Sequence, residues 1–181
     1  MSAPFEMEAV AEKVPQAVRC SSPQDLVAVV DDAVTRSGLL DVLDLFDHGT
    51  AGLQAMGDGV LWASDFDPDS ELANEQIARA LDRYLSPFAY VRLLGCRTAL
   101  DGGMRSGRML LIKLARALGQ HRVVFGSNDS IFQSAFDEQG FRNDQEMRSL
   151  YSSLAAIDGP APDIDTRMAR IMKIRKTVVT G

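Results

Sequence analysis

The chain has 181 residues, of which 46% are hydrophobic and 24% are charged, a mixture typical of one globular domain and not of a disordered or fibrous protein. The formal net charge of −6 argues against a protein that binds the nucleic-acid backbone through many Lys and Arg contacts. With two Cys, two His and no Cys-x-x-Cys spacing, the sequence favours neither a zinc site nor a disulfide framework.

No apolar run approaches the length of a bilayer span, and the opening MSAPFEMEAVAEKV is acidic where a secretory signal would be cationic and then apolar. We therefore expect a cytoplasmic protein with no membrane, metal or cofactor. We also expect one α/β domain over residues 1–160, followed by a basic tail or helix over 161–181. The basic residues of that segment could touch an acidic partner, although such a run is more often a solvated helix face.

The first part of the chain predicts a strand, a helix, a second strand and a ribbon. Residues 16–20 are extended in character, and Ser-Ser-Pro then begins a helix that Gly38 ends. Residues 39–46 (LLDVLDLF) predict a mostly buried strand that leads into Asp-His-Gly at 47–49. The glycine-rich stretch that follows predicts an exposed hairpin around residues 57–59.

The middle of the chain repeats this alternation. Apolar spacing predicts a helix within residues 67–85, which a Ser-Pro pair breaks. Residues 88–95 (FAYVRLLG) predict an apolar strand that delivers Cys96 into a turn. Residues 97–103 predict a loop, and 104–118 predict a helix that lies against the sheet.

A further strand is expected over residues 122–125, a polar loop over 126–129, and helical spacing recurs over 144–156. Parallel strands need crossover helices, so this order predicts an α/β three-layer sandwich with a mainly parallel, doubly wound sheet. The small β-ribbon is inserted after the His-Gly strand. Ligands of such sheets bind beyond the carboxyl ends of the strands, where His48, Cys96 and the polar loop would meet.

Cys96 and His48 are the candidate catalytic pair. A thiolate is the attacking species in cysteine catalysis, and a nearby imidazole takes its proton or stabilises its charge. Each of the two residues follows an apolar strand and has an adjacent glycine, which permits a tight turn and leaves room for a substrate. Singly, such residues are more often packing or turn residues, but their joint placement favours a shared site.

The blocks VLDLFDHGTAG and YVRLLGCRTA resemble the two signature blocks of the caspase-like cysteine peptidases. His48 and Cys96 are 48 positions apart, close to the spacing of about 50 typical of caspases. Within that group the chain is most similar to bacterial CHAT-like and DUF4347-type domains. The resemblance covers roughly residues 39–132. It departs from the family in Asp47, where many relatives have a small or neutral residue, and in lacking a caspase-type QACxG string.

The resemblance implies that His48 is the general base or ion-pair partner, Cys96 the nucleophile and Gly49 an oxyanion-hole donor through its N–H. Four aspartates are candidates for a pocket that accepts a basic substrate side chain, because three of them adjoin the predicted crevice in the sequence and the chain is acidic overall. Ordinary capping and solvation explain each of them almost as well. These are Asp44, Asp47, Asp101 and Asp129.

Three functions follow from these patterns. The first is a cysteine endopeptidase, a hydrolase that works through a thioester acyl-enzyme on a partner protein or on itself. The alternative is a catalytically silent caspase-like domain that acts in assembly, with a protein partner or as a homodimer. A nucleotide-binding or signalling domain has less support, because the sequence has neither a GxGxxG nor a GxxxxGK[ST] motif.

Overall fold

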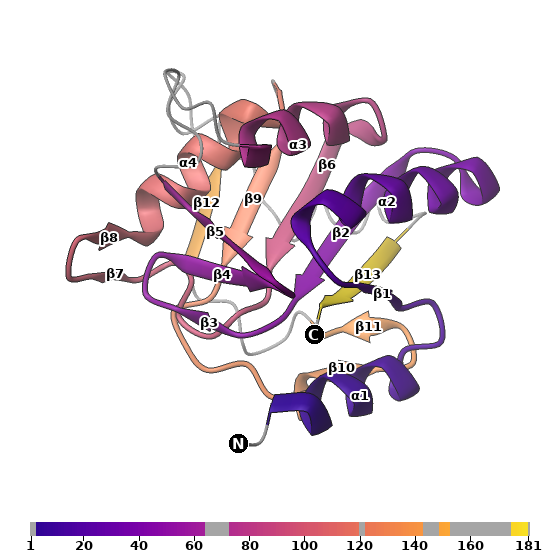
Figure 1. Cartoon of the computed structure of the whole chain (residues 1–181), viewed down its shortest axis with the longest axis horizontal. Coiled ribbons are helices and arrows are strands. Elements are labelled where there is room, and N and C mark those ends of the chain that lie inside the picture. Colours follow the sequence, from indigo (N-terminus) through magenta and orange to yellow (C-terminus); the bar gives the residue numbers. More distant parts are fainter. Residues whose placement is uncertain (1–2, 64–72, 120–121, 143–148, 153–174, 181) are drawn as a thin grey trace.

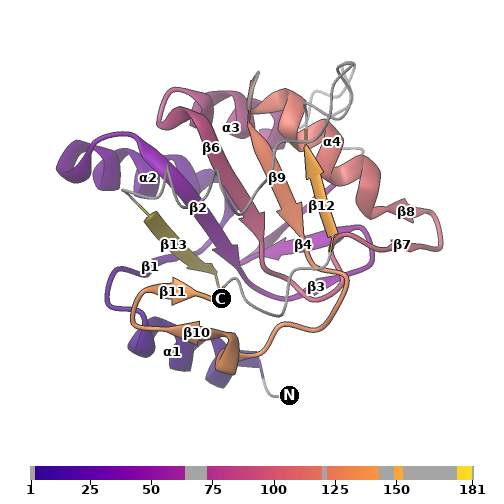
Figure 2. The same cartoon turned by 180° about the vertical axis from the view of Figure 1, so that it is seen from behind.

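The computed structural model describes residues 3–63, 73–119, 122–142, 149–152 and 175–180, and it shows an α/β fold built on a mainly parallel sheet. The described strands of this sheet lie in the order β1, β13, β2, β6, β9, β12 (Figures 1 and 2). Neighbours pair in parallel except for β12, which is antiparallel to β9. Their bounds are β1 Val18–Cys20, β13 Arg175–Thr180, β2 Leu40–Phe46, β6 Leu85–Leu93, β9 Val123–Gly126 and β12 Ser149–Ser152.

Helices α2 (Pro23–Ser37), α3 (Ala73–Asp82) and α4 (Gly107–Ala117) pack on one face of the sheet. The chain crosses the sheet in one direction from β1 through β2 and β6 to β9, and right-handed crossovers then place all three helices on the same side. None of the described helices is long and apolar enough to cross a bilayer. The predicted α/β class and mainly parallel sheet are confirmed.

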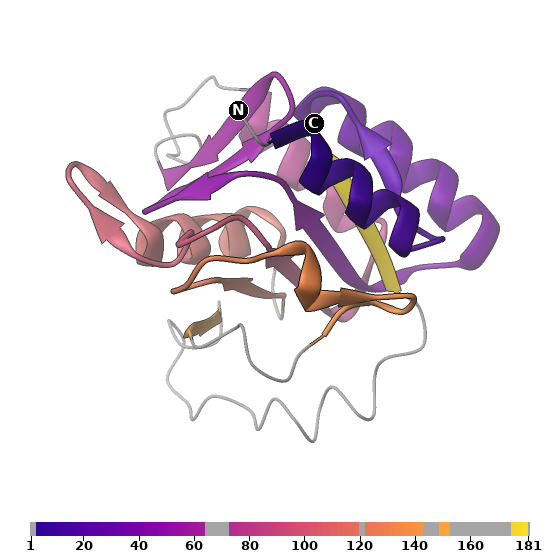
Figure 3. The ribbon, with the colours of Figure 1, turned by 90° about the horizontal axis from the view of Figure 1, so that it is seen from below.

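The opposite face is covered near the carboxyl ends of β2 and β6 by α1 (Ala3–Lys13), the short 3₁₀ helix η2 (Gln133–Ala135) and a two-stranded ribbon. The ribbon consists of β10 (Phe136–Asp137) and β11 (Gly140–Phe141), and α1 lies beside η2 and β10 (Figure 3). The connection between β12 and β13 lies outside the described residues. The three-layer, doubly wound arrangement therefore remains a prediction.

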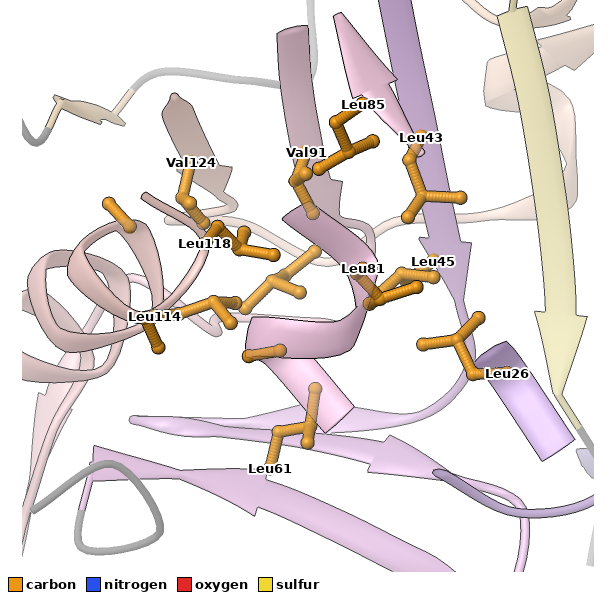
Figure 4. Close-up of a cluster of buried hydrophobic side chains, with 14 of the residues drawn as sticks. Leu26, Leu43, Leu45, Leu61, Leu81, Leu85, Val91, Leu114, Leu118 and Val124 are labelled. Carbon is orange, nitrogen blue, oxygen red and sulfur yellow. The ribbon is translucent and has the colours of Figure 1, made fainter. Parts of the chain in front are cut away.

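The main hydrophobic core lies between the sheet and helices α2, α3 and α4. Strand residues alternate between faces, so Leu43, Leu45 and Val91 point into this core. Leu26 of α2 and Leu81 of α3 meet them from the helical side (Figure 4). The predicted start and end of α2 are confirmed, because the Ser22 hydroxyl accepts the Asp25 N–H and Gly38, at φ +86°, donates its N–H to Val34.

The ribbon after the His-Gly turn has three strands, β3 (Gly49–Thr50), β4 (Leu53–Met56) and β5 (Gly59–Trp62). The predicted hairpin is confirmed, since Met56 pairs with Gly59. The expectation that it is exposed is wrong, because Gln54, Met56 and Leu61 are buried. Its inner face packs under α2 and α3 and closes one end of the core.

Two predicted boundaries shift for local reasons. Strand β6 begins at Leu85, ahead of the Ser-Pro pair, and Pro87 lies where the pairing with β2 is irregular between Leu40 and Val42. The expected helix over 104–118 begins at Gly107, because residues 101–102 and 105–106 form a small hairpin, β7–β8. Ser106 then caps α4 by accepting the Met109 N–H at 3.2 Å.

The last part of the chain differs most from expectation. Residues 149–152, expected to be helical, form the edge strand β12. Residues 175–180, assigned to a basic tail or helix outside the domain, form β13, which lies inside the sheet between β1 and β2. The segment Lys176–Val179 therefore belongs to the sheet register and is not a separate appendage.

A buried ion pair joins the two central strands. Asp44 of β2 and Arg92 of β6 lie opposite each other in register, and both side chains are almost completely buried. The Asp44 carboxylate accepts hydrogen bonds from both Nε and Nη2 of the guanidinium, the second at 2.7 Å, which is a bidentate geometry. The guanidinium also stacks on the Phe141 ring, 5.2 Å from its centroid.

We expect Arg92→Met to lower the free energy of unfolding by about 3–5 kcal/mol, because Asp44 would be left as an uncompensated buried charge. The double variant Asp44→Leu/Arg92→Met should recover most of that loss. The matched control is Arg36→Met in the exposed Asp32–Arg36 pair of α2, which should change stability by less than about 1 kcal/mol. Urea unfolding measures all three. A double variant no more stable than Arg92→Met would contradict the assignment.

Candidate active site

Strands β2 and β6 end side by side and deliver His48 and Cys96 to one edge of the sheet. The last rung of their ladder is the hydrogen bond from the Leu94 N–H to the Leu45 carbonyl, at 2.8 Å. Because β2 and β6 are parallel, both chains continue beyond this rung in the same direction. The predicted meeting of the two turns at this edge follows from that geometry.

The two turns touch through their glycines. A Cβ at Gly49 would lie 2.7 Å from the carbonyl carbon and Cα of Gly95 and 2.8 Å from the Cys96 nitrogen. A Cβ at Gly95 would lie 2.8 Å from the Gly49 Cα and 2.9 Å from the His48 carbonyl oxygen. These distances leave no room for any side chain, so glycine at both positions is required for the two backbones to meet.

His48 is fixed through its backbone and presents its side chain to solvent. Its N–H donates to the Asp47 carboxylate at 2.6 Å, and its carbonyl accepts the Ala55 N–H at 2.8 Å. The residue is exposed, and its imidazole has no hydrogen-bond partner among the residues that the structure describes, Cys96 included. A catalytic hydrogen bond often forms only when substrate binds, so an exposed, unengaged imidazole is compatible with a role as a base.

The Cys96 thiol is half-buried and contacts the backbone of Ile131. Its Sγ accepts the Ile131 N–H at 3.3 Å and lies 3.7 Å from the Ile131 carbonyl oxygen. The loop after β9 is tied to the Cys96 turn by two further bonds, from the Arg97 N–H to Asp129 and from the Ala99 N–H to Ser127. A thiol held in this way has a fixed position and a backbone amide donor beside its sulfur.

The backbone directly after Cys96 is strained. Arg97 has φ +59°, and it is the only residue besides glycine with a positive φ in the described part of the chain. This conformation costs about 1–3 kcal/mol for a residue with a side chain. Strained residues cluster at active sites, where the surrounding hydrogen bonds enforce them. Here the bond from Arg97 to the Asp129 carbonyl, 3.0 Å long, enforces it.

Two backbone N–H groups are available beside the thiol. The Ala55 N–H bonds to the His48 carbonyl, so residues 48 and 55 form a hydrogen-bonded pair and Gly49 and Gln54 a non-hydrogen-bonded one. The β3–β4 ladder therefore does not use the Gly49 N–H. The Cys96 N–H has no acceptor among the described residues. Both belong to the touching turns.

The aspartates predicted to bind substrate occupy different positions. Asp47 is buried, and its carboxylate accepts the N–H groups of His48 and Gly57, the latter at 2.8 Å, so it braces the ribbon against the His48 turn. Asp101, on β7, and Asp129 are exposed. Asp129 also accepts the Ser130 N–H through its carboxylate at 3.2 Å. The candidate Asp44 is instead bound to Arg92 inside the fold.

Cys20 provides an internal contrast to Cys96. It is 3% exposed, at the end of β1, and its thiol donates to the Ser22 carbonyl at 2.9 Å. Burial raises the pKa of the Cys20 thiol; an interaction with the Ser22 backbone opposes this shift and the nearby Asp25 charge adds to it. His121 lies outside the described residues. Among those that are described, no cluster of three or more His, Cys, Asp or Glu could hold a metal ion.

Gln54 is a residue of this site that the sequence did not reveal. It is completely buried on β4, and its Oε1 accepts the Gly95 N–H at 2.8 Å. The only signal in the sequence is that Gln54 shares a strand face with Met56, two residues on. The burial of Gln54 can be inferred from this spacing only when it is known which face of the ribbon points inward.

Comparisons with protein-family models, with curated proteins and with solved structures give no match to this chain. The chemical interpretation of the site therefore depends on its geometry and on the motifs that carry its two reactive groups.

We expect iodoacetamide to alkylate Cys96 in the folded protein much faster than Cys20, by at least about tenfold near neutral pH. Cys96 is partly exposed and accepts an amide N–H, whereas burial raises the pKa of the Cys20 thiol and shields it. Peptide mass spectrometry after timed labelling measures both sites in one sample. In urea the two rates should converge. Equal rates in the folded protein would contradict this description.

Proposed function

We propose that this chain is a caspase-like cysteine endopeptidase that uses Cys96 and His48. The observation that carries the proposal is the backbone contact between Gly49 and Gly95, which joins the turn that bears the imidazole to the turn that bears the thiol. Thiol and imidazole placed on touching turns at the carboxyl edge of a parallel sheet are the minimal equipment for nucleophilic catalysis.

In the proposed mechanism His48 takes the Cys96 proton, and the thiolate attacks the carbonyl carbon of the scissile peptide bond. The tetrahedral intermediate collapses to a thioester as the leaving amine receives a proton from the imidazolium. Water, deprotonated by His48, then hydrolyses the thioester and releases the second product and the free thiol. No cofactor enters these steps.

The N–H groups of Gly49 and Cys96 are the proposed donors to the developing oxyanion. Support comes from their hydrogen bonding: the β3–β4 ladder leaves the first unused, and the second has no acceptor among the described residues. A removed oxyanion donor typically costs about 100- to 1,000-fold in kcat. Among the predicted specificity residues, the exposed Asp101 and Asp129 are the better candidates for binding a basic side chain, because the Asp47 carboxylate is buried and both of its oxygens accept backbone N–H groups.

The second candidate is a caspase-like assembly domain without catalysis. One observation favours it: the Cys96 sulfur is half-buried and accepts the Ile131 N–H, while the imidazole makes no bond to the thiol. A protein of this kind would bind a protein partner, or a second copy of itself, independently of its thiol. The two candidates differ in whether the thiol is needed.

The decisive measurement is turnover of a fluorogenic peptide library in which the residue before the scissile bond is varied. We expect Cys96→Ala and His48→Ala each to lower kcat/KM by at least about a thousandfold, because the two groups act as one unit. Cys20→Ala is the control and should retain turnover.

Circular dichroism should show that all three variants are folded. Undiminished cleavage by Cys96→Ala would refute the proposed mechanism. A wild-type protein that cleaves no library member, nor itself, would favour the assembly domain.

A further inference from the structure

A single buried amide ties the Cys96 turn to the ribbon that holds His48. Gln54 is completely buried, and each end of its amide bonds to the backbone. Oε1 accepts the Gly95 N–H at 2.8 Å, and Nε2 donates to the Ala55 carbonyl at 3.0 Å. Ala55 in turn donates its N–H to the His48 carbonyl. The chain of hydrogen bonds that links His48 to Gly95 therefore passes through a single side chain, that of Gln54.

This bond lies where the sheet stops. The Leu94 N–H is still paired with β2, through the Leu45 carbonyl, whereas the next donor along the chain, the Gly95 N–H, is paired with Gln54. The Gln54 side chain thus supplies the acceptor for the first backbone donor beyond the last β2–β6 hydrogen bond. It also fills the space beside Gly95, since a Cβ there would lie 2.6 Å from Oε1.

We propose that Gln54 is a positioning residue, which holds Gly95 against Gly49 and so sets the geometry between the Cys96 thiol and the His48 imidazole. This inference rests on the proposed function. Both hydrogen bonds of the Gln54 amide go to the backbone, at Gly95 and at Ala55, so its effect passes through the two backbones that it joins. Loss of such a residue should lower kcat and leave KM nearly unchanged, because misplacement of a catalytic group by about 1 Å can cost 100-fold.

The test compares Gln54→Met, which keeps the length of the side chain and removes both hydrogen bonds, with Met56→Leu. Met56 is equally buried on the same face of β4, and its side chain makes no hydrogen bond to Gly95. Mass spectrometry measures the rate at which iodoacetamide labels Cys96 at a series of pH values between about pH 5 and pH 9. His48→Ala and the double variant Gln54→Met/His48→Ala complete the set.

In the wild type, part of the plot of Cys96 alkylation rate against pH should depend on His48. In that part of the pH range, His48→Ala should lower the alkylation rate by about tenfold or more. Gln54→Met should fall to within about twofold of His48→Ala, and the double variant should add no further loss, as expected of residues that act through one another. Met56→Leu should keep the wild-type profile. With the best library peptide, Gln54→Met should lower kcat by about 10- to 100-fold and change KM by less than about twofold.

Two results would overturn the inference and leave the peptidase proposal intact. The first is that Gln54→Met keeps the wild-type dependence of the Cys96 alkylation rate on pH. The second is that Met56→Leu lowers the alkylation rate as much as Gln54→Met does. A wild-type profile identical to that of His48→Ala would instead refute the cysteine–histidine pairing, and the role of Gln54 with it. If Gln54→Met does not fold, Gln54→Asn replaces it. This side chain is one methylene too short to bridge both backbone groups, and the same results are expected of it.

Discussion

The contact between the Gly49 and Gly95 backbones is the constraint on which the candidate site depends. Parallel pairing brings β2 and β6 to the same edge of the sheet, but it leaves the two chains free to diverge after the last rung at Leu94. The absence of a side chain at both glycines lets the turns close on each other. Gln54, from the ribbon, and Asp47, from the His48 turn, then brace the closed arrangement through hydrogen bonds to the backbone.

Beneath this contact lies a second constraint of electrostatic origin. Asp44 precedes His48 by the same number of residues as Arg92 precedes Cys96, and the two charged groups face each other in register. A one-residue slip of either strand would move its charge to the opposite face of the sheet and bury it unpaired among leucines. The ion pair therefore specifies the register that brings the two turns level with each other.

The two cysteines lie at different places in the fold, and we expect their thiols to differ in reactivity for that reason. Both lie at the carboxyl end of a parallel strand, yet Cys20 is the last residue of β1, beneath α2, where burial raises the pKa of its thiol. Cys96 lies beyond β6, between the exposed His48 turn and the loop that carries Ile131. The strained Arg97 and the bonds of Asp129 and Ser127 to the Cys96 turn make this loop part of the site.

The sequence by itself determined what local chemistry controls: the capped helix α2, the apolar strands β2 and β6, and the placement of His48 and Cys96 at one edge, because parallel strands end on the same side. Only the tertiary structure decided the insertion of β13 between β1 and β2, the strand at residues 149–152 and the inward orientation of Gln54. Each of these depends on a partner distant in the sequence, and neither composition nor periodicity encodes which partner a strand or a buried amide will meet.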